Sequence, residues 1–180
     1  MNRYFNDQAV RNVIARTAIA MLFGITMASA GGAGLAGSDV SFLIAAAEAG
    51  NAEIAASRIS QTKRTSANVK AFAETMLSDH AKVADELKEL ASKKGVNVPD
   101  LPNAWQQAEL SKLNALDDET FDVEYAQEIG VKAHMDAVAL FATAGQNASD
   151  AEIRSFAAKT LLTLQHHLQM AQTLIAGTKK

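Results

Sequence analysis

Residues 65–95 read TSANVKAFAETMLSDHAKVADELKELASKKG and predict one long amphipathic helix. A hydroxyl side chain at position 65 or 66 can cap its start, and Gly95 is typical of the residue just past a helix end. Lys93 and Lys94 suit the negative end of the helix dipole. One face of this helix carries apolar residues spaced three or four apart, which are Val69, Phe72, Met76, Leu77, Val83, Leu87 and Leu90. Such a face needs other helices to bury it.

The rest of the chain supplies those partner helices. Three further long stretches show the same helical spacing, and a short helix is expected after Pro99 and Pro102, the only prolines of the chain. Ser149 and Glu152 have the spacing of a capping box, which predicts the start of the last helix. The expected helices cover residues 39–63, 65–94, 104–114, 118–144 and 149–177.

The composition narrows the class of protein. The chain has 180 residues, of which 48% are apolar and 21% charged, as in an ordinary globular domain. It holds 36 alanines and no cysteine, which favours helix and excludes disulfides, thiol catalysis and cysteine-based metal sites. A net charge of −3 argues against a nucleic-acid partner. We therefore predict an all-α protein, an antiparallel four-helix bundle over residues 39–177 with a short extra helix in its second connection.

The first 30 residues have the pattern of a secretory signal peptide. Three arginines precede the uncharged apolar run 17–27, which is too short to span a bilayer, and Ala28 and Ala30 fit a cleavage site after Ala30. Ala36 offers a second cleavage site, and residues 31–38 then form a flexible linker. The exported part would carry 14 basic and 19 acidic side chains, a net charge of −5. The alternative is an uncleaved anchor over residues 17–38, although four glycines in its second half disfavour a helix there.

Polar residues on the apolar faces are the most informative ones for function. His80, His134 and His167 each fall at a core position of a different long helix, whereas the neighbouring His166 falls on the flank. The first long helix, expected over residues 39–63, directs Glu53 and Glu48 toward the interior. Counting residues in both directions from the turn near Arg64, between the first two long helices, places Glu48 level with His80. Glu53 is then expected nearer to that turn.

These five side chains are candidate ligands of a transition metal. Imidazole and carboxylate bind Zn, Fe, Mn or Cu, and bundle cores build such sites from facing helices. The same histidines also have a structural explanation, because one carboxylate or carbonyl can satisfy a buried imidazole, and Asp79, Glu53, Tyr125 and Glu128 are available. Methionines near the histidines would suit copper but are common core fillers, and they are Met76, Met135 and Met170.

Several segments resemble the exported bacterial family of unknown function numbered 4142. The resemblance covers about residues 39–176, and its most specific parts are Asp79-His80 and the Phe-Asp-x-x-Tyr pattern at 121–125. The other matching segments are 42–43, 49–54, 69–76, His134, 164–168 and Ala171. Two departures stand out, since Ala133 replaces an acid that often precedes the third-helix histidine, and Leu162 replaces a common proline.

The resemblance implies a ferritin-like bundle and an outer-membrane or periplasmic setting. It aligns His80, His134 and His167 with the family's recurrent histidines and Glu53 with its helix-one acid. A di-iron site is not expected, because that site needs Glu three residues before His, and here Leu77, Val131 and Leu164 stand there.

The sequence offers no catalytic or nucleotide-binding motif. It contains no Gly-x-Ser-x-Gly elbow and no glycine-rich phosphate loop. We therefore expect a non-enzymatic envelope protein connected with stress or metal handling, and an oxidoreductase only if redox-active iron or copper is found. The alternative is a structural or interaction bundle without metal, which binds an envelope partner. Contact with a membrane is expected only if the N-terminal segment is retained.

Overall fold

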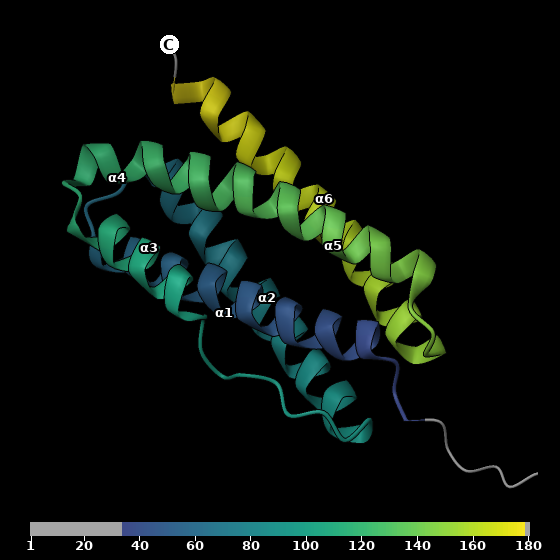
Figure 1. Cartoon of the computed structure of the whole chain (residues 1–180). Coiled ribbons are helices and arrows are strands. Elements are labelled where there is room, and N and C mark those ends of the chain that lie inside the picture. The colour runs from purple at the N-terminus through teal and green to yellow at the C-terminus, as the bar shows by residue number, and fades with distance from the viewer. Residues whose placement is uncertain (1–33, 179–180) are drawn as a thin grey trace, which may run out of the picture. The chain divides into compact units, whose positions relative to one another are not determined.

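The structure is a computed structural model that describes residues 34–178, and these residues form an all-α bundle (Figure 1). The predicted signal peptide and the first part of the linker lie outside the described residues. The helices are α1 (Gly37–Thr62), α2 (Ala67–Lys93), α3 (Ala104–Ala115), α4 (Asp118–Glu124), α5 (His134–Asn147) and α6 (Ala151–Thr178), with the π-helix η1 (Tyr125–Ala133) between α4 and α5. No helix among residues 34–178 is both long and apolar enough to cross a bilayer.

Four rods make up the bundle, as the spacing of apolar residues predicts. The segments α4, η1 and α5 run on without a break, because Tyr125 and His134 at their junctions keep helical backbone angles. This rod lies beside α6, while α1 lies beside α2, and the short α3 packs against α1 (Figure 1). The expected extra helix in the second connection is therefore confirmed. The predicted α-helix over 118–144 is wrong in one respect, since nine of its residues are π-helical.

The apolar core consists of two clusters with a polar layer between them. The first cluster joins the start of α1 and the end of α2 to α5 and α6, around Phe42, Phe141 and Phe156. The second joins the other halves of these rods around Phe72 and Tyr125. Along α2, His80 falls between Met76 of the second cluster and Leu87 of the first. His134, His167 and Glu53 fall between the two clusters on their own rods in the same way.

A buried carboxylate ties the start of α1 to the start of α6. Asp39 is 1% exposed and accepts hydrogen bonds from the backbone N–H groups of Ser149 and Asp150. Asp150 in turn accepts from the N–H groups of Glu152 and Ile153. The predicted capping role of Ser149 is therefore wrong, because Asp150 caps the helix and the N–H of Ser149 is taken by Asp39. Negative charge at this helix start is also favoured by the helix dipole.

The π-helix approaches α6 closely at a glycine. A Cβ atom built on Gly130 would lie 2.8 Å from the Cβ atom of Ala171, which is fully buried and cannot rotate away. Gly130 therefore sets the separation of the two rods one turn before His134. Only a residue without a side chain fits there while the rods keep this spacing.

We expect Gly130→Ala to lower the free energy of unfolding relative to Gly50→Ala by about 1–3 kcal/mol, because overpacking forces backbone shifts. Gly50 is the matched control, since it also lies in a helix and an added Cβ meets nothing within 4 Å. Both variants receive the helix propensity of alanine, so their difference isolates the contact with Ala171. Urea unfolding followed by circular dichroism measures it, and equal stabilities of the two variants would contradict the close approach.

Candidate metal centre

Three histidines from three rods meet in the polar layer. Their side chains are buried, with His80 3%, His134 0% and His167 1% exposed. The ring centroids form a nearly equilateral triangle, with 5.5 Å between His80 and His134, 5.2 Å between His80 and His167, and 5.4 Å between His134 and His167. One ring nitrogen of each lies within 4.8 Å of one from each of the others. The predicted meeting of three imidazoles in the bundle is thus what the structure shows.

The ring of His134 is oriented by the backbone of the π-helix. Its Nδ1 lies 2.9 Å from the carbonyl oxygen of Ile129, five residues earlier. A carbonyl oxygen only accepts, so Nδ1 carries the hydrogen and Nε2 keeps its lone pair. That Nε2 atom is buried and has no hydrogen-bond partner among the described residues. Ala133 leaves no acid directly before this histidine in the sequence, and the carbonyl of Ile129 orients its ring instead.

The ring of His80 is oriented by the carboxylate of Glu53. His80 Nδ1 and Glu53 Oε2 are 3.1 Å apart, and both side chains are almost fully buried. Burial raises the pKa of Glu53, against the opposing attraction of His80, and burial also lowers the pKa of His80. With Nδ1 held by the carboxylate, His80 Nε2 remains, and it too is buried without a partner in the described chain.

His167 is oriented by Asp79, the residue just before His80. His167 Nε2 lies 3.2 Å from Asp79 Oδ2. Burial alone would raise the pKa of Asp79, but hydrogen bonds from His167 and Lys82 outweigh it and hold this pKa below 3.8. The carboxylate is therefore ionised at neutral pH and accepts the Nε2 hydrogen of His167. The other ring nitrogen, Nδ1, is buried and unpartnered within residues 34–178.

The polar layer therefore contains three buried nitrogen lone pairs, one on each histidine. Burial lowers the pKa of each histidine below 6.5, and for His134 and His167 it outweighs the hydrogen bonds that act in the opposite direction. Neutral imidazoles with one nitrogen anchored and the other free have the state in which histidine binds metal. A single water has two hydrogens and cannot satisfy three acceptors at once.

The two predicted carboxylates play different parts. Glu53, not Glu48, is level with His80, and its second oxygen Oε1 also lies 3.6 Å from His134 Nδ1. Glu48 instead accepts a hydrogen bond from the side-chain amide of Asn103, in the connection before α3. The expected register between α1 and α2 is therefore wrong by more than one turn. His166 is exposed on the flank, as its position on the helix predicts.

Sequence reasoning missed two supports of the site. The π-helix places the carbonyl oxygen of Ile129 2.9 Å from His134 Nδ1, and no residue pattern in 125–133 distinguishes this segment from an α-helix. A buried chain of hydrogen bonds also runs from Tyr125 to α1, since Ser57 donates to the carbonyl of Glu53 and the Tyr125 hydroxyl lies 2.8 Å from Ser57 Oγ. Because Ser57 has one hydrogen, Tyr125 must donate to it. Burial raises the pKa of Tyr125, so the hydroxyl keeps this hydrogen.

Comparison with known proteins relates the chain to proteins without an assigned function. The family model described as Domain of unknown function (DUF4142) matches residues 25–174. Among curated proteins, no significant match is found. A solved DUF305 fragment from Deinococcus radiodurans is similar at 12% identity with a TM-score of 0.70, covering 79% of this chain and 97% of that one. A conserved hypothetical protein from Mycobacterium tuberculosis is similar at 17% identity with a TM-score of 0.62, covering 77% and 91%.

These two structures are evidence for the fold alone. At such low identity the shared feature is the arrangement of helices, and it agrees with the all-α bundle described above.

We expect the metal-free protein to lose stability as the pH falls below about 6.5, because the unfolded histidines take up protons that the buried ones resist. Glu53 has the opposite effect on stability: because its pKa is raised in the folded state, its contribution to the free energy of unfolding decreases as the pH rises above 4.5. Because the two effects oppose each other, the pH dependence of the free energy of unfolding is compared between a histidine variant and the parent chain. His134→Gln should reduce the pH slope of the free energy of unfolding by up to about 1.4 kcal/mol per pH unit relative to the parent chain. Urea unfolding between pH 5.5 and 7.5 with a chelator measures both, and equal slopes would contradict the burial of a neutral His134.

Proposed function

The chain belongs to the family described as Domain of unknown function (DUF4142), and we propose that its bundle binds one divalent transition-metal ion through His80, His134 and His167. The observation that carries this proposal is the set of three buried ring nitrogens without hydrogen-bond partners, which are His80 Nε2, His134 Nε2 and His167 Nδ1. Unpaired buried polar atoms cost free energy, and one cation in the middle of the triangle would satisfy all three.

The size of the triangle supports this proposal. Three nitrogens at about 2.0–2.1 Å from a tetrahedral ion lie about 3.3 Å apart, and rings aligned with their metal bonds then have centroids about 5.2 Å apart. The centroid separations of 5.2, 5.4 and 5.5 Å are close to that value. Small changes of side-chain torsion would bring the nitrogens from within 4.8 Å to this spacing. The site therefore fits an ion without movement of the rods.

The donor set narrows the choice of ion. Three imidazoles suit Zn, Cu or Fe, while Mn prefers oxygen ligands. The three methionines near the histidines have other surroundings, since Met76 and Met170 pack in or against the apolar cluster of Phe72 and Met135 is 55% exposed. Three protein ligands leave a fourth position for water or a small ligand, as in open zinc sites. Zn²⁺ is the simplest occupant, and such an ion would act there as a Lewis acid.

Glu53 and Asp79 act in this proposal as positioning residues. Each holds the ring nitrogen that faces away from the ion, on His80 and His167 respectively. Their two negative charges would balance a divalent ion at a site that is otherwise neutral. Such partners fix the tautomer and raise the basicity of the ligands. Glu48 has no part in the site as we propose it.

The setting that we propose is the cell envelope. The basic and apolar pattern of residues 1–30 supports export, and an excess of acidic side chains in the remaining chain suits a protein that collects cations. A role in metal handling or stress is the one that we propose for a site that holds an ion. If the site holds no metal, the alternative is a bundle that binds a partner and uses the histidines only as core residues.

We expect the untagged, chelator-treated protein to bind one Zn²⁺ per chain and to gain about 2.7 kcal/mol of stability at a free concentration 100-fold above Kd. Calorimetric titration and thermal unfolding measure these effects. His80→Gln and His134→Gln should weaken binding by more than about 100-fold, and Glu53→Gln by about 10–100-fold.

His166→Gln is the matched control, because it removes an exposed imidazole next to His167. It should bind Zn²⁺ like the parent chain. An equal loss in His166→Gln, or no stoichiometric binding by the parent chain, would overturn the proposal and leave the scaffold role.

For the envelope setting, we expect the protein recovered from an extracellular or periplasmic fraction to begin at Gly31, because Ala28 and Ala30 direct cleavage there. Mass spectrometry of the intact chain measures this end. Recovery of the chain with residues 1–30 attached, in the cytoplasmic fraction alone, would contradict export.

A further inference from the structure

One of the three groups that hold the outer histidine nitrogens reaches the surface of the bundle. The Asp79 side chain is 32% exposed, whereas the Glu53 side chain is 3% exposed and the Ile129 carbonyl belongs to the backbone of η1. Asp79 lies on α2 and binds His167 of α6, so its carboxylate bridges the two helices. The histidine layer therefore has one anchor in contact with solvent, on the face between α2 and α6, which we call the α2–α6 seam.

An ion that enters the layer from solvent needs a route through the bundle. The apolar clusters around Phe42 and Phe72 lie on either side of the layer along the rods, and moving a charge through apolar packing costs much free energy. The remaining routes are the faces between rods. Two of these faces, the α2–α6 seam and the face between α1 and the α4–η1–α5 rod, are less closely packed than the contacts of α1 with α2 and of α5 with α6.

The face between α1 and the α4–η1–α5 rod has no exposed carboxylate bound to the layer. It contains a hollow of about 610 Å³ that Glu53 lines, but Glu53 Oε2 is taken by His80 and Glu53 Oε1 is buried. The wall also includes Ala52 and Ala133, whose side chains have no ligand atom. Within residues 34–178, none of the other acidic side chains that line the hollow is bonded to a histidine.

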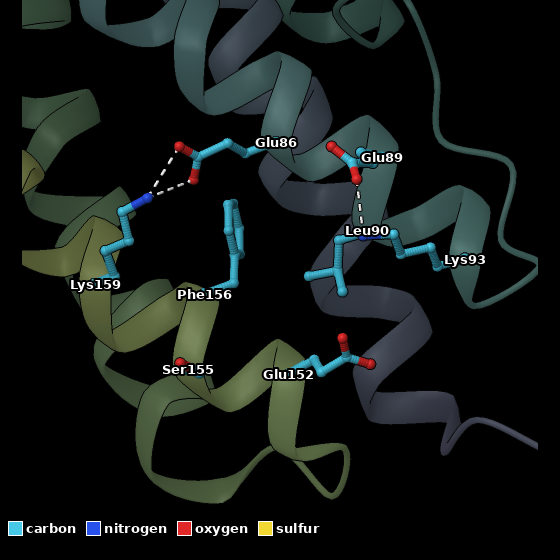
Figure 2. Close-up of a pocket in the computed structure, with 8 residues that line it drawn as sticks. All are labelled: Glu86, Glu89, Leu90, Lys93, Glu152, Ser155, Phe156 and Lys159. Carbon is cyan, nitrogen blue, oxygen red and sulfur yellow. Dashed lines mark hydrogen bonds and ion pairs between the residues drawn. The ribbon is translucent and has the colours of Figure 1, made fainter.

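Farther along the α2–α6 seam, lysines neutralise the carboxylates. Figure 2 shows the cleft that begins seven residues after Asp79, where both carboxylate oxygens of Glu86 lie 2.9 Å from Lys159 Nζ and so join α2 to α6. The other two acids that line this cleft are paired with lysines as well. Asp79 differs from all of them, because its partner across the seam is a histidine of the layer.

Lys82 limits how freely Asp79 can meet a cation. Its Nζ lies 3.3 Å from Asp79 Oδ1, and its side chain is 70% exposed. Exposed ion pairs of this kind contribute only about 0–1 kcal/mol, so a divalent ion can displace the ammonium group. Until it does, the positive charge of Lys82 repels an approaching cation. In the described part of the chain Lys82 is not bonded to any histidine, so it acts through Asp79.

We propose that Asp79 is the entry point of the metal site, where a divalent cation from solvent first binds and from which it passes inward as the His167 ring releases Asp79. This entry point rests on the proposed function, because it needs a site for the ion to enter. Asp79 and the inner lone pair are held by the two nitrogens of one imidazole, so the ion has a single ring to pass. Lys82 slows the step, and the bond between His167 and Asp79 closes the seam again once the ion is bound.

The experiment measures the association rate constant kon of Zn²⁺ with the metal-free, full-length chain. Stopped-flow mixing is followed by a fluorescent zinc chelator that reports the free ion. Asp79→Asn keeps the size of the side chain and removes its charge, and we expect it to lower kon by about 10-fold. A residue that only positions His167 would change the dissociation rate constant instead. A weaker Kd with an unchanged kon in Asp79→Asn would therefore overturn the proposal.

Lys82→Gln tests the same step in the opposite direction and leaves the layer intact. It should raise kon by at least about 2-fold, because it removes the ammonium group beside Asp79. Lys132→Gln is the matched control, since Lys132 is an exposed lysine paired with Glu128 at the other face of the bundle. It should leave kon unchanged. An equal rise in both variants would assign the effect to net charge and overturn the entry point.

Two further variants test the position of the entry. Glu86→Gln removes a negative charge from the same seam about 10 Å from Asp79, beyond the Debye length of about 8 Å at 0.15 M salt, and should leave kon unchanged. Ala52→Phe narrows the hollow at the other face and should also leave kon unchanged. Slower entry in Ala52→Phe with normal entry in Asp79→Asn would place the route at that hollow. If Asp79→Asn does not fold, Lys82→Gln against Lys132→Gln decides.

Equilibrium and kinetic measurements fail in different ways. If the parent chain binds one Zn²⁺ and kon is the same in Asp79→Asn and Lys82→Gln, the metal site stands and entry at Asp79 is wrong. If the parent chain binds no Zn²⁺ at equilibrium, the proposed function is wrong, and the entry point is wrong with it.

Discussion

The arrangement of this bundle depends on three imidazoles that are buried in one layer with a bare nitrogen each. The outer nitrogens are held by Glu53, by the carbonyl of Ile129 and by Asp79, so the inner ones have no hydrogen to offer one another. An apolar replacement of similar volume would avoid the cost of burying these polar groups. We therefore propose a bound cation, rather than packing alone, as the reason for a layer that keeps three acceptors close together.

The rest of the fold positions this layer. An apolar cluster lies on each side of it, so the register of all four rods is set by the contacts above and below the histidines. The contact of Gly130 with Ala171 brings η1 against α6, and the same π-helix carries the Ile129 carbonyl that orients His134. Local irregularity in a helix next to a polar site is frequent where the site has a function. Asp39 ties the far end of the bundle and keeps α1, which carries Glu53, in place.

The inward positions of His80, His134 and His167 could be predicted because helical spacing relates each to apolar neighbours within one turn. The four rods and the helix in the second connection followed from the same spacing and from Pro99 and Pro102. The level of Glu53 could not be predicted, since the turn between α1 and α2 shifts the register by amounts that local patterns do not encode. The π-helix could not be predicted either, because its residues are ordinary helix formers. The contact of Gly130 is with α6, which lies far along the chain. Asp150 displaced Ser149 as the cap because Asp39, a residue more than 100 positions earlier, occupies the competing N–H groups.

The measurement that tests the metal site most directly is X-ray absorption spectroscopy of the protein loaded with one equivalent of Zn²⁺. A first shell of four light atoms at about 2.0 Å with the outer-shell scattering of three imidazoles is the result that this account predicts. A shell of six oxygen atoms, or a single imidazole contribution that disappears in His166→Gln, would place the ion on the surface and contradict it.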